Sequence, residues 1–423
     1  MLDIKYIRDN PDLVRRATDN KNESADIDKI IELDQKRRTV IAEVEQLKAQ
    51  KNKVSEQIAV KKKNKEDASE DIAQMKEVGE KISELDKHLR SVNEALDYHL
   101  MRVPNKPDDD VPVGPDEASN VTIKEWGKVE TPAFEPLPHW DLGEKLDIID
   151  LAAASKITGS GFYILKGAGA RLQRALISFM LDKHALDGFV EIATPVVAGT
   201  AAMTGTGQLP KLADDMYFLK DDGLYLIPTG EVPVTNLHSG EILSEDQLPK
   251  YYMAATNCFR REAGAAGKDT RGLLRVHQFD KVELVKIVHP EKSEEEHETL
   301  LAQAEKIVQA LKIPYRVKLL ATGDLSFAAA KCYDIEIWSA GVAKFLEVSS
   351  VSNFRDFQAR RMNCRFRDQD NKVYFVHTLN GSGLALPRLM AAIVENYQTD
   401  YGTIKVPEVL LPYMGGITEI SKK

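Results

Sequence analysis

The sequence predicts an α+β protein in which helices flank a mainly antiparallel β-sheet and a long helical hairpin precedes it. Two observations predict this fold. Apolar residues repeat in heptads over about residues 27–100, with one polar interruption, which is typical of a coiled coil. Beyond residue 118, short runs rich in β-branched and aromatic residues follow one another without helical crossovers. This succession favours antiparallel strands over a doubly wound sheet.

Length, charge and cysteine content narrow the class of protein. A chain of 423 residues predicts two domains or more, and a net charge of −9 argues against a generally basic nucleic-acid surface. The three cysteines are far apart in the sequence, so we expect no disulfide framework and no zinc site. The charged N-terminus does not resemble a signal peptide. No apolar run approaches the ~18 residues of a membrane span, and we expect a cytoplasmic protein without membrane contact.

The heptads predict an antiparallel coiled-coil arm within residues 1–103. Asn10-Pro11 first indicates a short helix. The two long helices that follow are separated by the polar segment KKKNKEDASED, which leaves room only for a tight reversal. At ~1.5 Å per residue each helix would be roughly 50 Å long. The repeating positions are Val40, Val44, Leu47, Lys51, Val54 and Ile58 in the first helix, and Ile82, Leu85, Leu89, Val92 and Leu96 in the second.

The charge of the hairpin permits two interpretations. Residues 29–66 contain 11 Lys and Arg against 6 Asp and Glu, whereas residues 67–102 contain 5 against 9. The hairpin is either a solvated coiled coil whose helices attract each other, or an arm that binds a polyanion through its basic helix. Charge alone leaves both open. The candidate contacts are Lys51, Lys53, Lys61, Lys62 and Lys63.

A proline- and aspartate-rich segment, residues 104–117, predicts a linker to a second domain over 118–423. Two amphipathic helices are expected in that domain, at 169–186 and in the segment GLALPRLMAAIVENY. Short β-rich runs such as FVEIATP, KYYMAATNCFR and FDKVELVKIV predict its strands. Neither a Walker nor a Rossmann glycine signature is present.

Charged residues are concentrated in the segment 259–283. FRRE ends one predicted strand, and RVHQFDKVE, from Arg275 to Glu283, reads as the returning strand. Residues two apart on a strand share a face, so guanidinium groups, an aromatic ring and carboxylates would lie together. Guanidinium groups bind phosphate and a carboxylate binds an ammonium group. A site for a nucleotide plus an amine and a salt-bridged outer strand pair are both open interpretations.

FRRE-x12-R-x3-F-x3-E resembles motif 2 of the class II aminoacyl-tRNA synthetases. LNGSGLALPRLMAAIVEN resembles motif 3 of that class, and FVEIATPVV resembles motif 1. Within the class, GTGQLPKL, the TGE triplet at 229–231, FLEVSSVSNFRDFQARR and VPEVLLPYMGG are similar to the bacterial and organellar type of the seryl-tRNA synthetase family. The similarity covers essentially the whole chain. It implies the antiparallel class II catalytic core and a tRNA-binding arm.

The resemblance implies an ATP site on the sheet. Arg260 would bind the α-phosphate, Arg388 the γ-phosphate, and Phe279 would stack on adenine. Catalysis would rest on Arg260, Arg388 and Glu347 without a protein nucleophile. Glu347 and Ser350 would carry Mg²⁺ with ATP, and the loop 263–272 would close over the nucleotide. The remaining ATP-site residues are Arg261, Glu262, Arg275, Val276, Val348 and Ser349.

The family positions also imply a serine pocket beside the α-phosphate. Polar groups aimed at the serine hydroxyl would reject alanine and glycine, and Glu283 would hold the ammonium group. Asn380 fits the pocket or a structural role equally well. Pro387 stands where relatives usually have glycine, and we expect Arg388 to keep its place. The serine-binding residues are Thr229, Gly230, Glu231, Glu283, Asn380 and Ser382.

The resemblance therefore implies a homodimeric enzyme, joined through its motif 1 region, that uses ATP to charge tRNA(Ser) with L-serine. It implies tRNA(Sec) as a further substrate. Two alternatives remain. A related ligase that loads a carrier protein would lack the long arm, which the heptads predict. A non-catalytic paralogue that binds RNA or a coiled-coil partner would have lost the site, yet Arg260, Glu283, Glu347 and Arg388 are all present.

Overall fold

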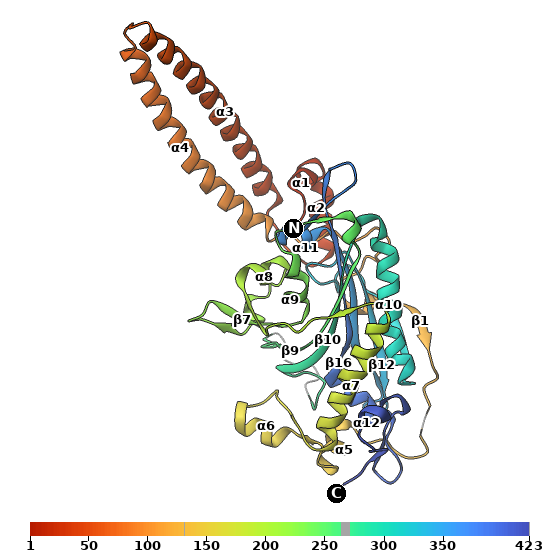
Figure 1. Cartoon of the computed structure of the whole chain (residues 1–423). Helices are drawn as coiled ribbons and strands as arrows, with labels where there is room; N and C mark the ends of the chain where they lie inside the picture. Colours follow the sequence, from red (N-terminus) through yellow and green to blue (C-terminus); the bar gives the residue numbers. More distant parts are fainter. Residues whose placement is uncertain (131, 264–270, 423) are drawn as a thin grey trace. The chain divides into compact units, whose positions relative to one another are not determined.

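The computed structural model describes residues 1–130, 132–263 and 271–422 and divides into two compact units, Met1–Pro104 and Asn105–Lys423. Figure 1 draws both units, each of which is described by itself below. The loop expected to close over ATP lies mostly in 264–270, outside the described residues.

The first unit is helical and contains the predicted coiled-coil arm. Two short helices, α1 (Ile4–Asp9) and α2 (Pro11–Asn20), precede the long helices α3 (Ile27–Lys63) and α4 (Ser69–Leu100). Figure 1 shows α3 and α4 side by side with a tight turn between them. The antiparallel coiled coil is thus confirmed. Its seam buries Val40, Val44 and Val54 from α3, and Ile82, Val92 and Leu96 from α4.

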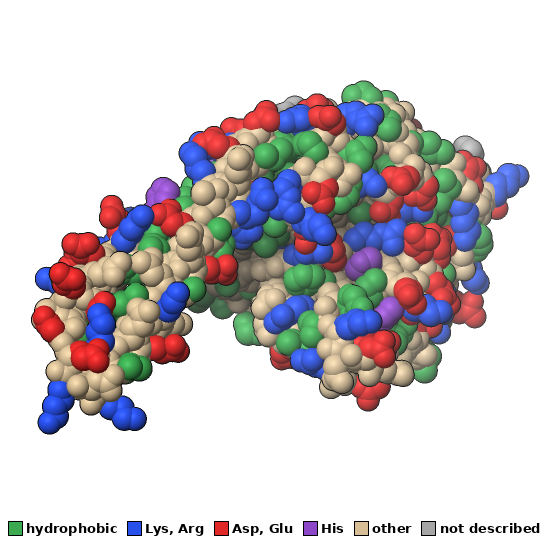
Figure 2. All heavy atoms as spheres, turned by 90° about the horizontal axis from the view of Figure 1, so that it is seen from above, with side chains coloured by type: hydrophobic (Ala, Val, Ile, Leu, Met, Phe, Trp, Pro, Cys, Tyr) green, Lys and Arg blue, Asp and Glu red, His purple; other side chains and the backbone are tan. Residues whose placement is uncertain are grey.

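Ion pairs within and between the helices stabilise this unit. Asp34 is completely buried on α3 and accepts hydrogen bonds from Arg8, Arg37 and Arg38 at 3.0–3.1 Å. A buried carboxylate needs such partners because its desolvation is costly. Lys81 on α4 contacts Glu43 on α3 at 2.9 Å. Figure 2 shows acidic and basic side chains interspersed along the hairpin.

The second unit is built on an eight-stranded sheet, which confirms the predicted α+β class. Neighbouring strands are antiparallel except that β4 runs parallel to β9. In spatial order the strands are β1 (Val121–Trp126), β11 (Tyr315–Leu319), β12 (Lys331–Ser339), β13 (Lys344–Arg355), β16 (His377–Ala385), β10 (Gln278–Val288), β9 (Lys250–Phe259) and β4 (Val190–Glu191).

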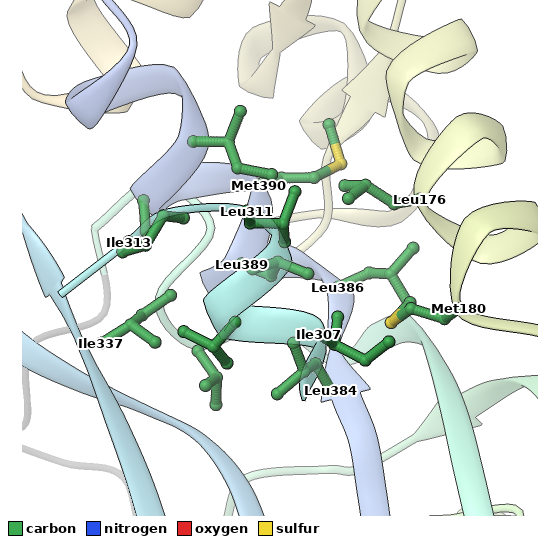
Figure 3. Close-up of a cluster of buried hydrophobic side chains, with 14 of the residues drawn as sticks. Leu176, Met180, Ile307, Leu311, Ile313, Ile337, Leu384, Leu386, Leu389 and Met390 are labelled. Atoms are coloured by element: carbon green, nitrogen blue, oxygen red, sulfur yellow. The ribbon is translucent and has the colours of Figure 1, made fainter. Parts of the chain in front are cut away.

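Three helices cover one face of this sheet and form the main core with it. They are α7 (Ala168–Leu186), α10 (Ser293–Ala310) and α12 (Leu386–Asn396). Figure 3 shows Leu176 and Met180 of α7 pointing toward Leu386 and Leu389 of α12, with Ile307 of α10 beside them. Burial of these apolar side chains is the main force that holds the helices on the sheet.

The opposite face of the sheet carries the cavity described below. Alternation along β10 sends Val282 and Leu284 into the main core, whereas Lys281, Glu283 and Val285 lie on the other face. Shorter helices near that face are α8 (Thr200–Gly205), α9 (Glu231–Thr235) and α11 (Phe357–Met362). Further elements of this unit are the helices α5 (His139–Lys145) and α6 (Leu151–Thr158), and several short 3-10 helices. Small sheets are formed by β5 (Val197–Gly199), β7 (Leu224–Leu226) and β6 (Phe218–Leu219), and by β15 (Val373–Phe375), β14 (Arg365–Arg367) and β8 (Ile242–Ser244). Two-stranded sheets are formed by β2 (Ile149–Asp150) with β3 (Ile164–Leu165), and by β17 (Ile404–Lys405) with β18 (Glu419–Ile420).

Residues of the expected linker segment are bonded within the second unit. The Asn105 side chain donates to the carbonyls of Ala328 and Phe354 at 2.9 Å. Asp108 pairs with Arg355 at 2.7 Å, and Gly114 N donates to Thr322. This part of the chain is therefore fixed by specific hydrogen bonds, despite its proline-rich composition.

Two predicted strand boundaries are wrong. The returning strand of motif 2 begins at Gln278 rather than Arg275, because His277 N donates to the carbonyl of Gly161 instead of joining the β9 ladder. Arg275 and His277 therefore do not share a strand face with Phe279. The strand expected to end at Pro195 is limited to Val190–Glu191.

Candidate active site

A cavity of about 470 Å³ lies over β10, β13 and β16 and brings together most of the predicted site residues. The motif 2 residues come from the end of β9 and from β10, and Arg388 comes from the first turn of α12, directly after Pro387. The predicted residues that line the cavity are Thr229, Glu231, Arg260, Glu262, Arg275, Val276, Phe279, Glu347, Val348, Ser350, Asn380, Ser382 and Arg388.

One end of the cavity is a buried cluster, which we define as Thr229, Glu231, Lys281 and Glu283. All four side chains are almost completely buried. Thr229 Oγ1 donates to Glu283 Oε2 at 2.7 Å and accepts from Lys281 Nζ at 2.8 Å. Lys281 also forms an ion pair with Glu283. Glu283 is therefore ion-paired within the protein itself.

The Glu231 carboxyl is the unusual group of this cluster. Its pKa is raised to about 7, first by burial and then by the nearby Glu283 charge. Gln358 Nε2 donates to Glu231 Oε1 at 2.6 Å and to the carbonyl of Thr206. Gln358 Oε1 accepts from Thr378 Oγ1 at 2.7 Å. Since a carbonyl can only accept, the orientation of the Gln358 amide is fixed.

Neighbouring strands pack closely around the buried cluster. Asn380 Nδ2 on β16 donates to Glu283 Oε1 at 3.3 Å, and Ser382 pairs with Glu283 in the β10–β16 register. A Cβ on Gly230 would lie 3.1 Å from both Glu283 Cβ and Thr256 Oγ1. A glycine at position 230 thus allows the start of α9 to approach the sheet closely.

The other end is an arginine cluster, which we define as Glu262, Arg275, Glu347 and Arg388. Arg275 forms an ion pair with Glu262. Arg388 Nη1 donates to the Glu347 carbonyl at 2.8 Å and to its Oε2 at 3.3 Å. The Arg388 and Glu347 side chains are 28% and 46% exposed, so this end is much more solvated than the buried cluster.

Arg260 and Phe279 lie between the two ends. The Arg260 guanidinium is 5.3 Å from the centre of the Phe279 ring, and its Nε donates to the carbonyl of Pro228 at 3.3 Å. Phe279 packs against Cys258 and Val276. A guanidinium group next to an aromatic face can bind phosphate while the ring contacts a planar base.

Glu347 and Ser350 offer oxygen ligands of the kind that Mg²⁺ prefers. Ser350 Oγ donates to Glu347 Oε1 at 3.1 Å. Desolvation acts to raise the pKa of the Glu347 carboxyl, but the Arg388 charge and the Ser350 hydrogen bond lower it below its ordinary value. The residue pair fits Mg²⁺ bound together with phosphates. Among the described residues, no group of three or more His, Cys, Asp or Glu could hold a metal ion.

Four predicted residues do not line the cavity. Glu283 and Gly230 lie directly behind its buried end, as described above. Ser349 Oγ donates to the carbonyl of Ser382, on the neighbouring strand. Arg261 Nη1 donates to the carbonyl of Asp214 at 3.1 Å, outside the cavity lining.

Sequence reasoning gave no site role to three polar residues of this region. Lys281 stands two residues before Glu283, and alternation along the strand places both on one face. Gln358 had no such signal, because α11 brings it to Glu231 from 127 residues away. Asp334 pairs with Ser350 across β12 and β13, and burial together with Glu347 raises its pKa well above the ordinary value.

Comparisons with known proteins agree with this geometry. Residues 1–107 match the model of the seryl-tRNA synthetase N-terminal domain, and residues 217–397 match that of the tRNA synthetase class II core domain (G, H, P, S and T). A serine–tRNA ligase of Thermomicrobium roseum is 52% identical over 100% of this chain and 95% of its own length. The chain belongs to the seryl-tRNA synthetase family. Another member, the serine–tRNA ligase of Halothermothrix orenii, is 54% identical over 98% of this chain and 99% of its own length.

Solved structures of the seryl-tRNA synthetase family show the same fold. The crystal structure of seryl-tRNA synthetase from Pyrococcus horikoshii complexed with ATP superposes with a TM-score of 0.93, at 40% identity and full coverage of both chains. A cytoplasmic serine–tRNA ligase of Naegleria fowleri in complex with AMP gives a TM-score of 0.87 at 32% identity, over 100% of this chain and 99% of its own. In the part of the chain that the structure describes, no helix is long and apolar enough to span a membrane.

Proposed function

We propose that this chain is a cytoplasmic, ATP-dependent serine–tRNA ligase that forms seryl-adenylate and transfers the seryl group to the 3′ terminal ribose of tRNA(Ser). One observation carries the proposal: a single cavity joins an acidic buried cluster, suited to a small amino acid, to an arginine cluster, suited to a triphosphate. The names of the relatives and the ATP in the Pyrococcus structure support the same activity.

ATP would lie across the sheet with its phosphates at the arginine cluster. Arg260 binds the α-phosphate, Arg388 binds the γ-phosphate, and Phe279 stacks on adenine. Glu347 and Ser350 would hold Mg²⁺, which supplies charge neutralisation to the phosphates when bound. Arg388 Nη1 already donates to the Glu347 carbonyl at 2.8 Å. The arginine therefore needs little reorganisation when the nucleotide binds.

L-serine would occupy the buried cluster. The resemblance implies Glu283 as the partner of the serine ammonium group, but Lys281 already neutralises Glu283. Glu231 lines the cavity, so we propose that Glu231 receives the ammonium group instead. Thr229 and Ser382 surround the serine hydroxyl, with Glu283 behind them. Alanine and glycine would leave these buried groups without a partner, which costs binding free energy.

Both chemical steps are displacements. A serine carboxylate oxygen attacks the α-phosphorus, the bond to the bridging oxygen breaks, and pyrophosphate leaves with the electron pair. A hydroxyl oxygen of the terminal tRNA ribose then attacks the seryl carbonyl carbon and loses its proton to solvent. The bond between that carbon and the phosphate oxygen breaks, and AMP leaves with the electron pair. Arg260 stabilises the negative charge that grows on the α-phosphate in the first step.

The helical hairpin of residues 1–103 would be the tRNA-binding domain, joined by the segment 104–117 to a catalytic domain over 118–423. Lys51, Lys53, Lys62 and Lys63 are exposed, whereas Lys61 pairs with Asp71 at 2.6 Å. Exposed lysines on a long helix suit the phosphates of an RNA backbone. The same arm would accept tRNA(Sec) as a second substrate.

Charge reversal tests the arm. Replacing Lys51, Lys53, Lys62 and Lys63 with Glu should raise the KM for tRNA(Ser) at least about tenfold, because each lost phosphate contact weakens binding. Serine-dependent ATP–pyrophosphate exchange should not change. A control variant carries Lys→Glu at the exposed Lys292 and Lys372 of the second unit. An unchanged KM for tRNA(Ser) in the arm variant would contradict this part of the proposal.

A homodimer joined through residues 168–195 is also proposed. Leu186 and Val190 are 82% and 55% exposed in this region, and burial of these apolar side chains against a second copy would stabilise the dimer. Light scattering should give twice the chain mass, and Leu186→Glu should shift the population toward the monomer.

Serine-dependent ATP–pyrophosphate exchange is the central test of the proposed activity. We expect exchange with L-serine and at least about 100-fold less with glycine, alanine or threonine. Absence of exchange with every amino acid would overturn the proposed function. Charging of tRNA(Ser) and tRNA(Sec) transcripts then tests the two RNA substrates separately.

A further inference from the structure

His139, the first residue of α5, lies at the centre of a buried hydrogen-bond network that sequence reasoning did not assign. Its side chain and that of Glu395, near the end of α12, are both almost completely buried. Glu395 Oε1 accepts from His139 N at 2.9 Å and from His139 Nδ1 at 2.7 Å. Glu395 Oε2 accepts from Ser339 Oγ and from Gly341 N. Glu395 is thus fixed from two sides.

The hydrogen bonds of His139 define its tautomer. Leu273 N lies 2.9 Å from His139 Nε2, and a backbone amide can only donate. Nε2 is therefore the unprotonated nitrogen, and Nδ1 carries the proton that is donated to Glu395. Burial acts to raise the pKa of Glu395, but the bonds from His139 and Ser339 lower it below its ordinary value, so a carboxylate is available as the acceptor.

Further contacts hold residues 271–274 against the start of α5. Arg271 is 4.7 Å from the centre of the Trp140 ring and 3.5 Å from Asp141. Gly272 has φ +66°, and a Cβ there would lie 2.3 Å from His139 Nε2. The glycine therefore allows both the left-handed backbone and the close approach to the histidine. These contacts fix the position of this turn relative to α5.

The same turn holds Arg388. The carbonyl of Leu274, adjacent to Leu273, accepts from Arg388 Nε at 3.1 Å. A continuous set of hydrogen bonds therefore runs from Glu395 through His139 and the turn to the guanidinium of the arginine cluster. We infer that His139 is a positioning residue, which aligns Arg388 for the polyphosphate of ATP without touching it. This inference rests on the proposed function.

Two isosteric variants separate the two bonds of the imidazole. In His139→Asn the side-chain amide can still donate to Glu395 from the Nδ1 position, but the acceptor for Leu273 N is lost. In His139→Gln the amide oxygen can occupy the Nε2 position and accept from Leu273 N, whereas the donor to Glu395 is lost. Each variant removes one buried hydrogen bond, so both should lose similar thermal stability.

We expect the Asn variant to raise the KM for ATP in pyrophosphate exchange about tenfold, with the KM for serine within about twofold of wild type. The KM for ATP of the Gln variant should stay within about threefold of the wild-type value. A purely structural role predicts equal effects of the two variants, or equal effects on ATP and serine, and either result would overturn the inference. Wild-type protein without serine-dependent exchange would instead overturn the proposed function.

A double-mutant cycle locates the effect at Arg388. The dissociation constant of ATP with Mg²⁺ is measured by titration calorimetry for wild type, His139→Asn, Arg388→Ala and the double variant. His139→Asn should weaken ATP binding about tenfold in the wild type and less than about twofold when Arg388 is already absent. Equal weakening in both backgrounds would show that His139 does not act through Arg388.

Discussion

The buried cluster and the arginine cluster lie in one cavity but differ in their contact with water. Lys281 and Glu283 are 7% and 0% exposed, whereas Arg388 and Glu347 are 28% and 46% exposed. Buried polar groups must be satisfied by partners of fixed geometry, so the buried cluster can select an amino acid by its hydrogen bonds. Partly solvated charges tolerate variation in position, which suits the arginine cluster to phosphate charge.

The largest effect is expected at Arg260, between the two ends. Arg260→Ala should lower kcat for pyrophosphate exchange about 10³-fold, because the charge that develops on the α-phosphate loses its partner. The KM for serine should change less than about threefold. Arg260→Lys, which keeps the charge without the bidentate geometry, should recover part of the loss. If Arg260→Ala raised the KM for serine by the same factor by which it lowered kcat, the two ends of the cavity would not have separate roles.

Lys281→Met tests the ion pair of the buried cluster. The variant leaves the Glu283 carboxylate buried without its cation, so the free energy of unfolding should fall by about 3 kcal/mol. The KM for serine should rise about 100-fold, and the KM for ATP should stay within about twofold. Lys372→Met is the matched control, because Lys372 is exposed and its ion pair contributes little. Equal stability of the two variants in urea unfolding would contradict the prediction.

Gln358→Met removes the amide that donates to Glu231. Loss of this hydrogen bond should raise the pKa of Glu231 further above 7, so more of the carboxyl is neutral at pH 7. The KM for serine should then rise about tenfold at pH 7 and recover toward wild type at pH 8.5. A rise that does not depend on pH would mean that Gln358 acts only through packing.

In the wild-type enzyme, the KM for serine and the KM for ATP should depend differently on pH. With a pKa of about 7, Glu231 becomes neutral as the pH falls and loses its attraction for the serine ammonium group. The KM for serine should therefore rise about fivefold between pH 7 and pH 6 and be nearly constant above pH 8. The KM for ATP should stay nearly flat, since the pKa of Glu347 is lowered. Parallel pH profiles for both substrates would argue against Glu231 as the titrating group.

The smallest effect is expected from salt. Raising KCl from 50 to 500 mM should increase the KM for ATP about threefold, because ions screen the partly exposed arginine cluster. The KM for serine should change much less, since the buried cluster is shielded from ions. Initial rates with an inert osmolyte at matched osmolarity provide the control. A larger salt effect on serine than on ATP would reverse the assignment of the two ends.

Periodic patterns in the sequence predicted most of the fold. The heptads located both long helices of the arm because helix pairing depends on a local repeat. The resemblance to the class II synthetase motifs predicted that Arg260, Phe279, Glu347 and Arg388 would lie together, and the structure places all four at one cavity. Alternation failed for Arg275 and His277, because the strand they were assigned to begins only at Gln278.

Contacts between distant segments could not be predicted. Gln358 and Glu231 are 127 residues apart, and His139 and Glu395 are 256 residues apart. No local propensity connects such pairs, because only the packing of helices on the sheet brings them within hydrogen-bond distance. Arg261 illustrates the opposite limit: it lies in the motif, yet the Asp214 carbonyl holds its guanidinium outside the cavity lining.

The position of β10 within the sheet has a consequence for amide hydrogen exchange. β10 is hydrogen-bonded to β9 on one side and β16 on the other, whereas β1 and β4 are edge strands. Amides of such a central strand exchange only through the largest opening reactions, and those of an edge exchange through small local ones. Deuterium should therefore reach Lys281 and Glu283 among the last residues of the chain, so the amino acid pocket persists until the catalytic unit unfolds as a whole.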